Sequence, residues 1–100
     1  MVRHVILWQL KEEMSPEEKA TVLANMKSAL EALIGQVPGL QALTVHTTGL
    51  PSSNADAMLD SVLEDEAALK GYAVHPQHVA AAEGFVRPFV KTRLCMDFDI

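Results

Sequence analysis

Three polar rings lie close together in the C-terminal third of the chain: Tyr72, His75 and His78. They comprise the only tyrosine and two of the four histidines. A neutral imidazole can accept a proton from an activated carbon, and a phenol can donate a hydrogen bond to an oxygen on which charge develops. The spacing predicts that these rings share the rim of one site.

Pro76 separates the roles of the two histidines. Proline disfavours helix in the residue before it and suits the first helical position, so a new helix should begin at Pro76. His75 then lies at the helix start, where it can cap the free amides, and it is also a ligand-binding candidate. His78 lies in the first turn, where the positive end of the helix dipole disfavours the imidazolium. Alternatively, Tyr72 and His78 bond each other or nearby backbone and only hold the broken helix together.

Other site chemistry has less support in the sequence. His75 and His78 have a metal-ligand spacing, but zinc needs three or four ligands and Pro76 breaks the helix that would align the two rings. Cys95 is the only cysteine and has no evident activating partner in its segment, so we do not expect a nucleophile. Phosphate loops and dinucleotide fingerprints do not occur. We expect no metal and no cofactor.

The composition predicts one globular domain over residues 1–100, with 49% apolar and 21% charged residues. The net charge of −5 and the lack of a lysine or arginine cluster argue against a nucleic-acid partner. Apolar runs are too short to cross a membrane, and we expect no signal peptide. A single cysteine fits a reducing compartment, so we expect a cytoplasmic protein.

The hydrophobic periodicity predicts the elements that position these rings. Strands are expected at 2–10, 40–48 and 90–98, and helices from Pro16 to near Gly35, over 65–70 and from Pro76 to before Pro88. Segment 56–64 is ambiguous, because its composition suits a helix and its alternation suits a strand. As a strand it gives the α+β order β-α-β-β-α-β, a ferredoxin-like four-stranded antiparallel sheet with helices on one face. The first helix should bury Leu23, Met26, Leu30, Leu33 and Ile34.

Both faces of the first strand carry large apolar groups. Alternation places His4, Ile6, Trp8 and Leu10 on one face, and Arg3, Val5, Leu7 and Gln9 on the other. Helices cover only one face of such a sheet. We expect the face with Trp8 to be left open and covered by a second copy, with the two sheets packed face to face. The alternative is a monomer with a solvated sheet.

Several short motifs occur along the chain in a fixed order. They are His4-Val5-Ile6-Leu7-Trp8, Val37-Pro38-Gly39-Leu40, Asp56 through Ser61, Leu69 through Val79, Arg87-Pro88 and Asp97-Phe98. In this order and spacing the chain resembles the stress-responsive α/β-barrel (Dabb) domain family over nearly its whole length. Leu63 stands where the family usually has phenylalanine, and Ala57 where a bulkier residue is common, which could change the size of a cavity.

The resemblance implies a ferredoxin-like subunit, a strand at 56–64 and a homodimer whose two sheets form a barrel with an internal cavity. The family contains stress-induced proteins and a plant polyketide (olivetolic acid) cyclase, which closes a ring by an aldol-type reaction. A histidine of its Tyr-x-x-His-Pro-x-His block acts as base, and the tyrosine assists. These roles map here onto His78 and Tyr72, with His4 as a further pocket residue.

The expected function is therefore binding of a small apolar or carbonyl-containing molecule in a cavity lined by His4, Trp8, Tyr72 and His78. A sharper hypothesis is a cofactor-free cyclase, lyase or isomerase. The alternative is a non-catalytic stress-response or assembly protein whose histidines and tyrosine are structural.

Overall fold

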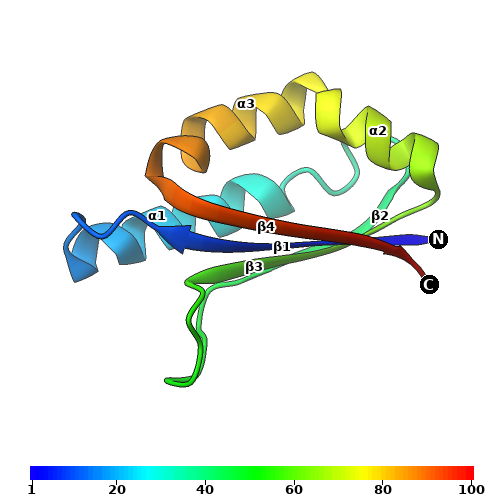
Figure 1. Ribbon diagram of the computed structural model, residues 1–100. Coiled ribbons are helices and arrows are strands. Elements are labelled where there is room, and N and C mark those ends of the chain that lie inside the picture. The colour runs from blue at the N-terminus through cyan, green and yellow to red at the C-terminus, as the bar shows by residue number, and fades with distance from the viewer.

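Four strands form one antiparallel sheet in the order β2-β3-β1-β4 in the computed structural model, which describes residues 1–100. The strands are β1 (Val2–Leu10), β2 (Leu40–His46), β3 (Ala57–Leu63) and β4 (Val90–Asp99). The helices α1 (Pro16–Glu31), α2 (Glu66–Val74) and α3 (Pro76–Phe85) pack on one side, and the short helix η1 (Arg87–Phe89) leads into β4 (Figure 1). The ferredoxin-like prediction and the strand at 56–64 are confirmed.

The helices cover the face of β1 that we expected to be open. Trp8 is only 4% exposed and belongs to the same hydrophobic cluster as Met26 and Leu30 of α1. The prediction that a second copy covers Trp8 is therefore wrong. Alternation along β1 defines two faces, but it does not say which face receives the helices.

The uncovered side of the sheet, which we call the open face, carries large apolar side chains from β1 and β4. Leu7 pairs with Leu94 across the two strands, and the exposed fractions of Leu94 and Met96 are 63% and 67%. The loop at 47–56 extends beyond this face (Figure 1), and its Leu50 is 75% exposed. An apolar face still needs a cover, although it is not the face that we predicted.

The first helix begins as predicted and ends earlier than predicted. Ser15 and Glu18 form a capping box, with Pro16 in the first helical position. The helix buries Val22, Met26 and Leu30, whereas Ile34 is 46% exposed. The predicted burial of Ile34 is wrong because the helix ends at Glu31, after which residues no longer follow the helical period. No helix of the chain has the length and apolar character needed to span a bilayer.

The second helix runs further than the expected 65–70. Asp65 caps α2 by accepting a hydrogen bond from the backbone N–H of Ala68 at 2.8 Å, and the helix continues through Gly71 to Val74. Gly71 does not end the helix, and beyond its chain neighbours and the adjoining helix backbone no atom lies within 4 Å of the position that a Cβ would take there. Because α2 continues, Tyr72 lies in its last turn and is only 2% exposed.

Candidate functional site

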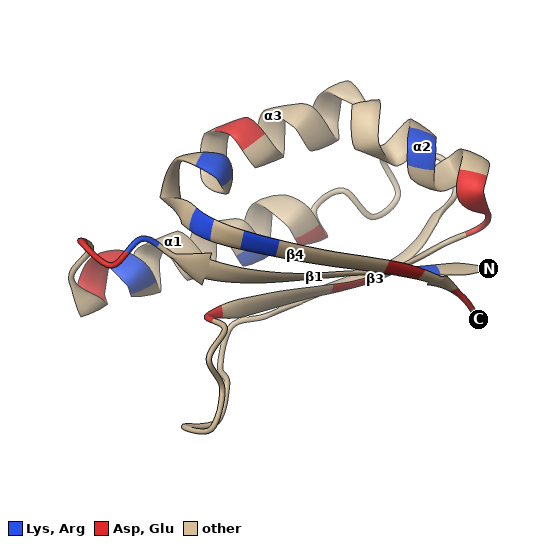
Figure 2. Ribbon diagram, viewed as in Figure 1, with Lys and Arg blue, Asp and Glu red and all other residues tan.

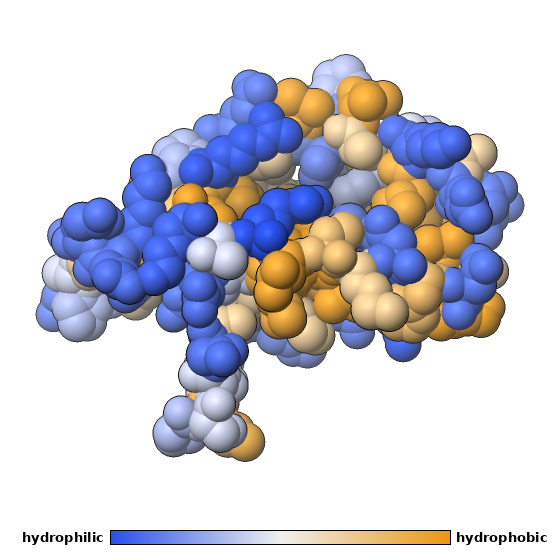
Figure 3. Space-filling view, viewed as in Figure 1, coloured by the Kyte–Doolittle hydropathy of each residue, from blue (hydrophilic) through white to orange (hydrophobic).

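A pocket of about 360 Å³ lies between the sheet and the helices α2 and α3. His4 and Trp8 of β1, Tyr72 of α2 and His78 of α3 all line it. Most of the other lining side chains are apolar, and Figure 3 shows the surface hollowed between α3 and β4. The structure thus brings these four candidate residues to one pocket. The pocket lies inside a single chain, whereas the resemblance led us to expect a cavity between two sheets.

His78 is held in one tautomer by the backbone. Its Nδ1 lies 3.3 Å from the carbonyl oxygen of Ala73, which can only accept, so Nδ1 carries the proton and Nε2 is the basic nitrogen. Burial lowers the pKa of His78, as do the nearby cations Arg87 and Arg93, while the hydrogen bond to Ala73 opposes the shift. His78 is therefore a neutral imidazole near pH 7.

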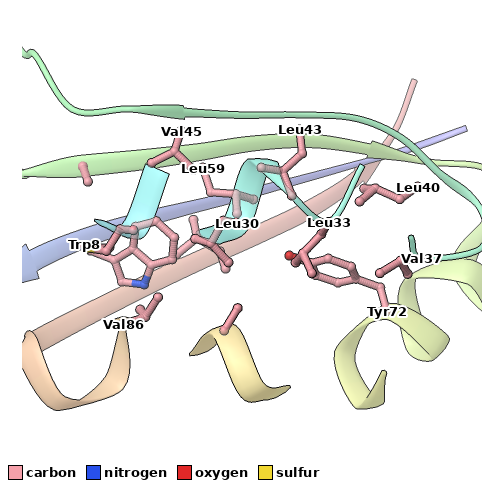
Figure 4. Close-up of a cluster of buried hydrophobic side chains, with 14 of the residues drawn as sticks. Trp8, Leu30, Leu33, Val37, Leu40, Leu43, Val45, Leu59, Tyr72 and Val86 are labelled. Carbon is pink, nitrogen blue, oxygen red and sulfur yellow. The ribbon is translucent and has the colours of Figure 1, made fainter. Parts of the chain in front are cut away.

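Tyr72 contacts both pocket histidines. Its ring centroid lies 4.2 Å from that of His78 and 5.9 Å from that of His4. Figure 4 shows the Tyr72 side chain extending from its helix among the buried apolar residues, near Leu33. Burial raises the pKa of Tyr72 to about 12, so the phenol stays protonated and can donate a hydrogen bond at any physiological pH.

His75 is not part of the pocket. Its Nδ1 accepts a hydrogen bond from the backbone N–H of Gln77 at 3.2 Å and caps α3. The predicted capping role is confirmed. His75 does not line the pocket with His78, although only two residues separate them in the sequence.

A second group of polar side chains supports His4 from β4. His4 is opposite Asp97 in the strand register, and its Nδ1 bonds the Asp97 carboxylate. The Cys95 sulfur lies 3.7 Å from the same Nδ1 and 3.6 Å from Asp97. Sequence reasoning missed this group, because only the β1–β4 register brings its members together.

The ligand atoms of His4, Cys95 and Asp97 lie within 4.8 Å of one another, a spacing that could hold a metal ion. Burial raises the pKa of the Cys95 thiol, and the Asp97 carboxylate adds to this shift. A protonated thiol is a poor nucleophile. The arrangement instead suits a hydrogen-bond network that holds the His4 ring against the pocket.

Two arginines at the pocket were also missed. Arg93 lies opposite Trp8 in the β1–β4 register, which puts its side chain on the pocket side of the sheet. Arg87 lies in η1, where α3 turns into β4. They are the only charged side chains among those that line the pocket, apart from the titratable histidines. The alternating strand pattern assigns Arg93 to one of the two faces of the sheet. It does not show that this face borders a pocket.

Comparisons with known proteins agree with this architecture. The family model of the Stress responsive A/B Barrel Domain (Dabb) matches residues 2–100. A dimeric protein of unknown function with a ferredoxin-like fold from Bacteroides fragilis is similar at 29% identity and a TM-score of 0.92, over 99% of this chain and 95% of that one. Comparison with curated protein sequences finds no match.

More distant structures share the fold. A Dabb family protein from Mesorhizobium loti is 23% identical with a TM-score of 0.75, over 99% of this chain and 95% of that one. Hydroxynitrile lyase from Passiflora edulis is 16% identical with a TM-score of 0.74, over 99% of this chain and 92% of that one. The solved structures of similar fold thus include dimeric proteins of unknown function and a hydroxynitrile lyase.

Proposed function

This chain belongs to the stress-responsive A/B barrel (Dabb) family, and we propose that its pocket binds a small, largely apolar carbonyl compound and catalyses its conversion without a cofactor. One observation carries the proposal: a neutral His78 with a defined tautomer contacts a protonated Tyr72 in an apolar pocket. A base beside a hydrogen-bond donor is what removal of a proton next to a carbonyl requires.

The reaction begins at a carbon next to a carbonyl. Nε2 of His78 takes the proton from this carbon, and the electron pair of the C–H bond forms an enolate. Tyr72 donates a hydrogen bond to the enolate oxygen, where the negative charge develops. His78 becomes an imidazolium in this step. Because burial disfavours the charge, the imidazolium is transient.

The enolate can then close a ring. Its carbon attacks a second carbonyl carbon of the same molecule, so that a C–C bond forms and the π electrons move onto the second oxygen. That oxygen takes the proton from the His78 imidazolium, which restores the base. His4, held by Asp97, lies against the Tyr72 ring and lines the same space, so it supports the position of the phenol.

The same site also suits a lyase, because the reverse aldol step uses the same base and donor. The Passiflora edulis relative is described as a hydroxynitrile lyase and shares the fold of this chain. We therefore propose a cyclase and a lyase activity as the forward and reverse directions of the same aldol-type reaction.

We further propose that two copies pack through their open faces and that the protein is cytoplasmic. The exposed apolar residues Leu94, Met96 and Phe98 would be buried by such packing, and the Bacteroides fragilis relative is described as dimeric. The exposed free thiol of Cys95 supports a reducing compartment. If the pocket proves inert, this interface is the feature that favours the alternative function, a non-catalytic assembly protein.

The proposed chemistry can be tested with the methyl ester of succinylacetone, a neutral β-diketone. Its central methylene exchanges hydrogen for deuterium when a base removes a proton, and proton NMR follows the exchange. Wild-type protein should accelerate the exchange over buffer, and His78→Gln should lower the catalysed rate by about 100-fold or more. Tyr72→Phe should also slow it, because the enolate loses its donor.

His75→Asn is the matched control, since it removes a neighbouring imidazole but keeps a side chain that caps helices well. It should exchange at the wild-type rate. Wild-type exchange no faster than buffer, with His78→Gln changing only the melting temperature, would replace the proposal with the structural role for Tyr72 and His78.

A further inference from the structure

The pocket is locally basic in an acidic protein. The chain has 13 acidic and 8 basic side chains, yet the 13 residues that line the pocket include Arg87 and Arg93 and no aspartate or glutamate. Figure 2 shows the basic positions of β4 and of the α3 end on the same side of the molecule. Charge of this sign at a pocket raises the local concentration of anions.

Arg93 is the cation that remains available. Arg87 pairs with Glu83 at 3.4 Å, one helical turn before it. The other ion pairs of the chain involve Arg3, His4, Lys27 and Lys91, so Arg93 has no carboxylate partner. Its position opposite Trp8 directs it toward the pocket side of the sheet. A guanidinium without a carboxylate partner beside an apolar pocket can bind an anionic group of a ligand.

From this geometry we infer that the substrate carries a carboxylate, which Arg93 binds at the pocket mouth while the carbonyl end lies against Tyr72 and His78. The inference rests on the proposed function and names its substrate class, a small keto acid. The apolar walls of Ile6, Leu59 and Val86 would contact the carbon chain between the two ends.

A carboxylate fits this site better than a phosphate. One planar guanidinium matches the two oxygens of a carboxylate, with two parallel hydrogen bonds. A phosphate group usually draws on additional donors, such as the free amides at a helix N-terminus. At the start of α3 these amides are not free, because Pro76 has none and His75 accepts from Gln77.

The test compares succinylacetone, a keto acid, with its neutral methyl ester. Binding is followed by the fluorescence of Trp8, the only tryptophan, which lines the pocket, and proton removal by deuterium exchange. Wild-type protein should bind the acid about tenfold more tightly than the ester, because Arg93 is exposed and water weakens the contact. Arg93→Gln should abolish this preference, because it weakens binding of the acid more than binding of the ester.

Two further variants separate the substrate class from the chemistry. Arg87→Gln should reduce the preference less than Arg93→Gln, since Glu83 already engages Arg87. His78→Gln should stop exchange but keep the preference for the acid in the fluorescence assay. If wild-type protein does not accelerate deuterium exchange but His78→Gln still binds the acid more tightly than the ester, the proposed chemistry is refuted and the carboxylate inference is not.

Equal binding of acid and ester by wild-type protein, no binding of either, or an unchanged preference in Arg93→Gln would each overturn the carboxylate inference. Wild-type exchange of the ester would still support the proposed chemistry in the first and third cases. Melting temperatures of all variants close to wild type exclude loss of fold as the cause.

Discussion

The two faces of the sheet are built from the same strands and differ in almost every property. On the pocket side, β1 and β4 present His4, Trp8 and Arg93 around a cavity. On the open face, the alternate residues of these strands present Leu7 and Leu94, which are large, apolar and exposed. The pocket side holds polar groups around a cavity, while the open face exposes apolar groups that only a partner would remove from water.

In the proposed account the pocket side carries out the chemistry and the open face mediates assembly. A buried polar side chain and an exposed apolar surface both depart from ordinary burial, and both therefore indicate a function. A strand with period two can carry both signals at once, one on each face. Substitutions on the pocket side should then change the chemistry, and substitutions on the open face should change the assembly. Neither set should strongly affect the other property.

The largest expected effect breaks the assembly. Met96→Asp places a charge in the centre of the proposed interface, where burial without a partner is unfavourable, so the dimer should weaken by about 100-fold or more. Mass measurement over a dilution series detects the change. Val74→Asp adds the same charge at a position of α2 that is 74% exposed, and it should leave the dimer intact.

A wild-type protein that stays monomeric at micromolar concentration would contradict the assembly half of this comparison. So would a Met96→Asp variant that dimerises as tightly as wild type.

A second prediction concerns pH and probes only the pocket side. Burial lowers the pKa of His78, and only the neutral imidazole can accept a proton. The exchange rate should therefore be constant from neutral pH to about pH 8, above which the β-diketone itself ionises, and fall about tenfold per pH unit below the lowered pKa of His78. The pKa of Tyr72, about 12, causes no loss within this range.

Exchange rates over this pH range, measured on the ester of succinylacetone and corrected for the buffer reaction, test the prediction. A rate that begins to fall above the ordinary histidine pKa as the pH decreases would show that His78 is not the base, or that its pocket does not disfavour the charge. The oligomeric state should not follow the same curve.

The smallest expected effect concerns the cap of α3, a position that belongs to neither face of the sheet. His75→Ala removes the acceptor for the Gln77 amide and should lower the free energy of unfolding by about 1 kcal/mol, whereas His75→Asn should restore most of it. Denaturant unfolding measures the difference. Neither substitution should change deuterium exchange by more than about twofold, and a large loss in His75→Asn would return His75 to the site.

The sequence was most informative where local chemistry decides the structure. Pro76 alone predicts that His75 caps a helix and that His78 lies in its first turn, and both follow from proline geometry. The ferredoxin-like order likewise follows from strand and helix periods, with segment 56–64 resolved only through the family resemblance.

The sequence was least informative where two strands meet. Asp97 contacts His4 although 93 positions separate them, and Arg93 reaches the pocket because it pairs with Trp8. Such contacts depend on strand order and register, which no local pattern contains. For the same reason the prediction exchanged the two faces of β1. Both faces carry apolar groups, so either one could have received the helices.

The state of the His78 ring tests the central claim most directly. Nitrogen NMR of histidine-labelled protein distinguishes protonated from bare ring nitrogens and follows them with pH. The structure predicts a protonated Nδ1, a bare Nε2 and a pKa below the ordinary histidine value, with the Nε2 signal shifting when succinylacetone is added. A protonated Nε2 near neutral pH, or a ring that does not respond to the ligand, would contradict the account of His78 as the base of this pocket.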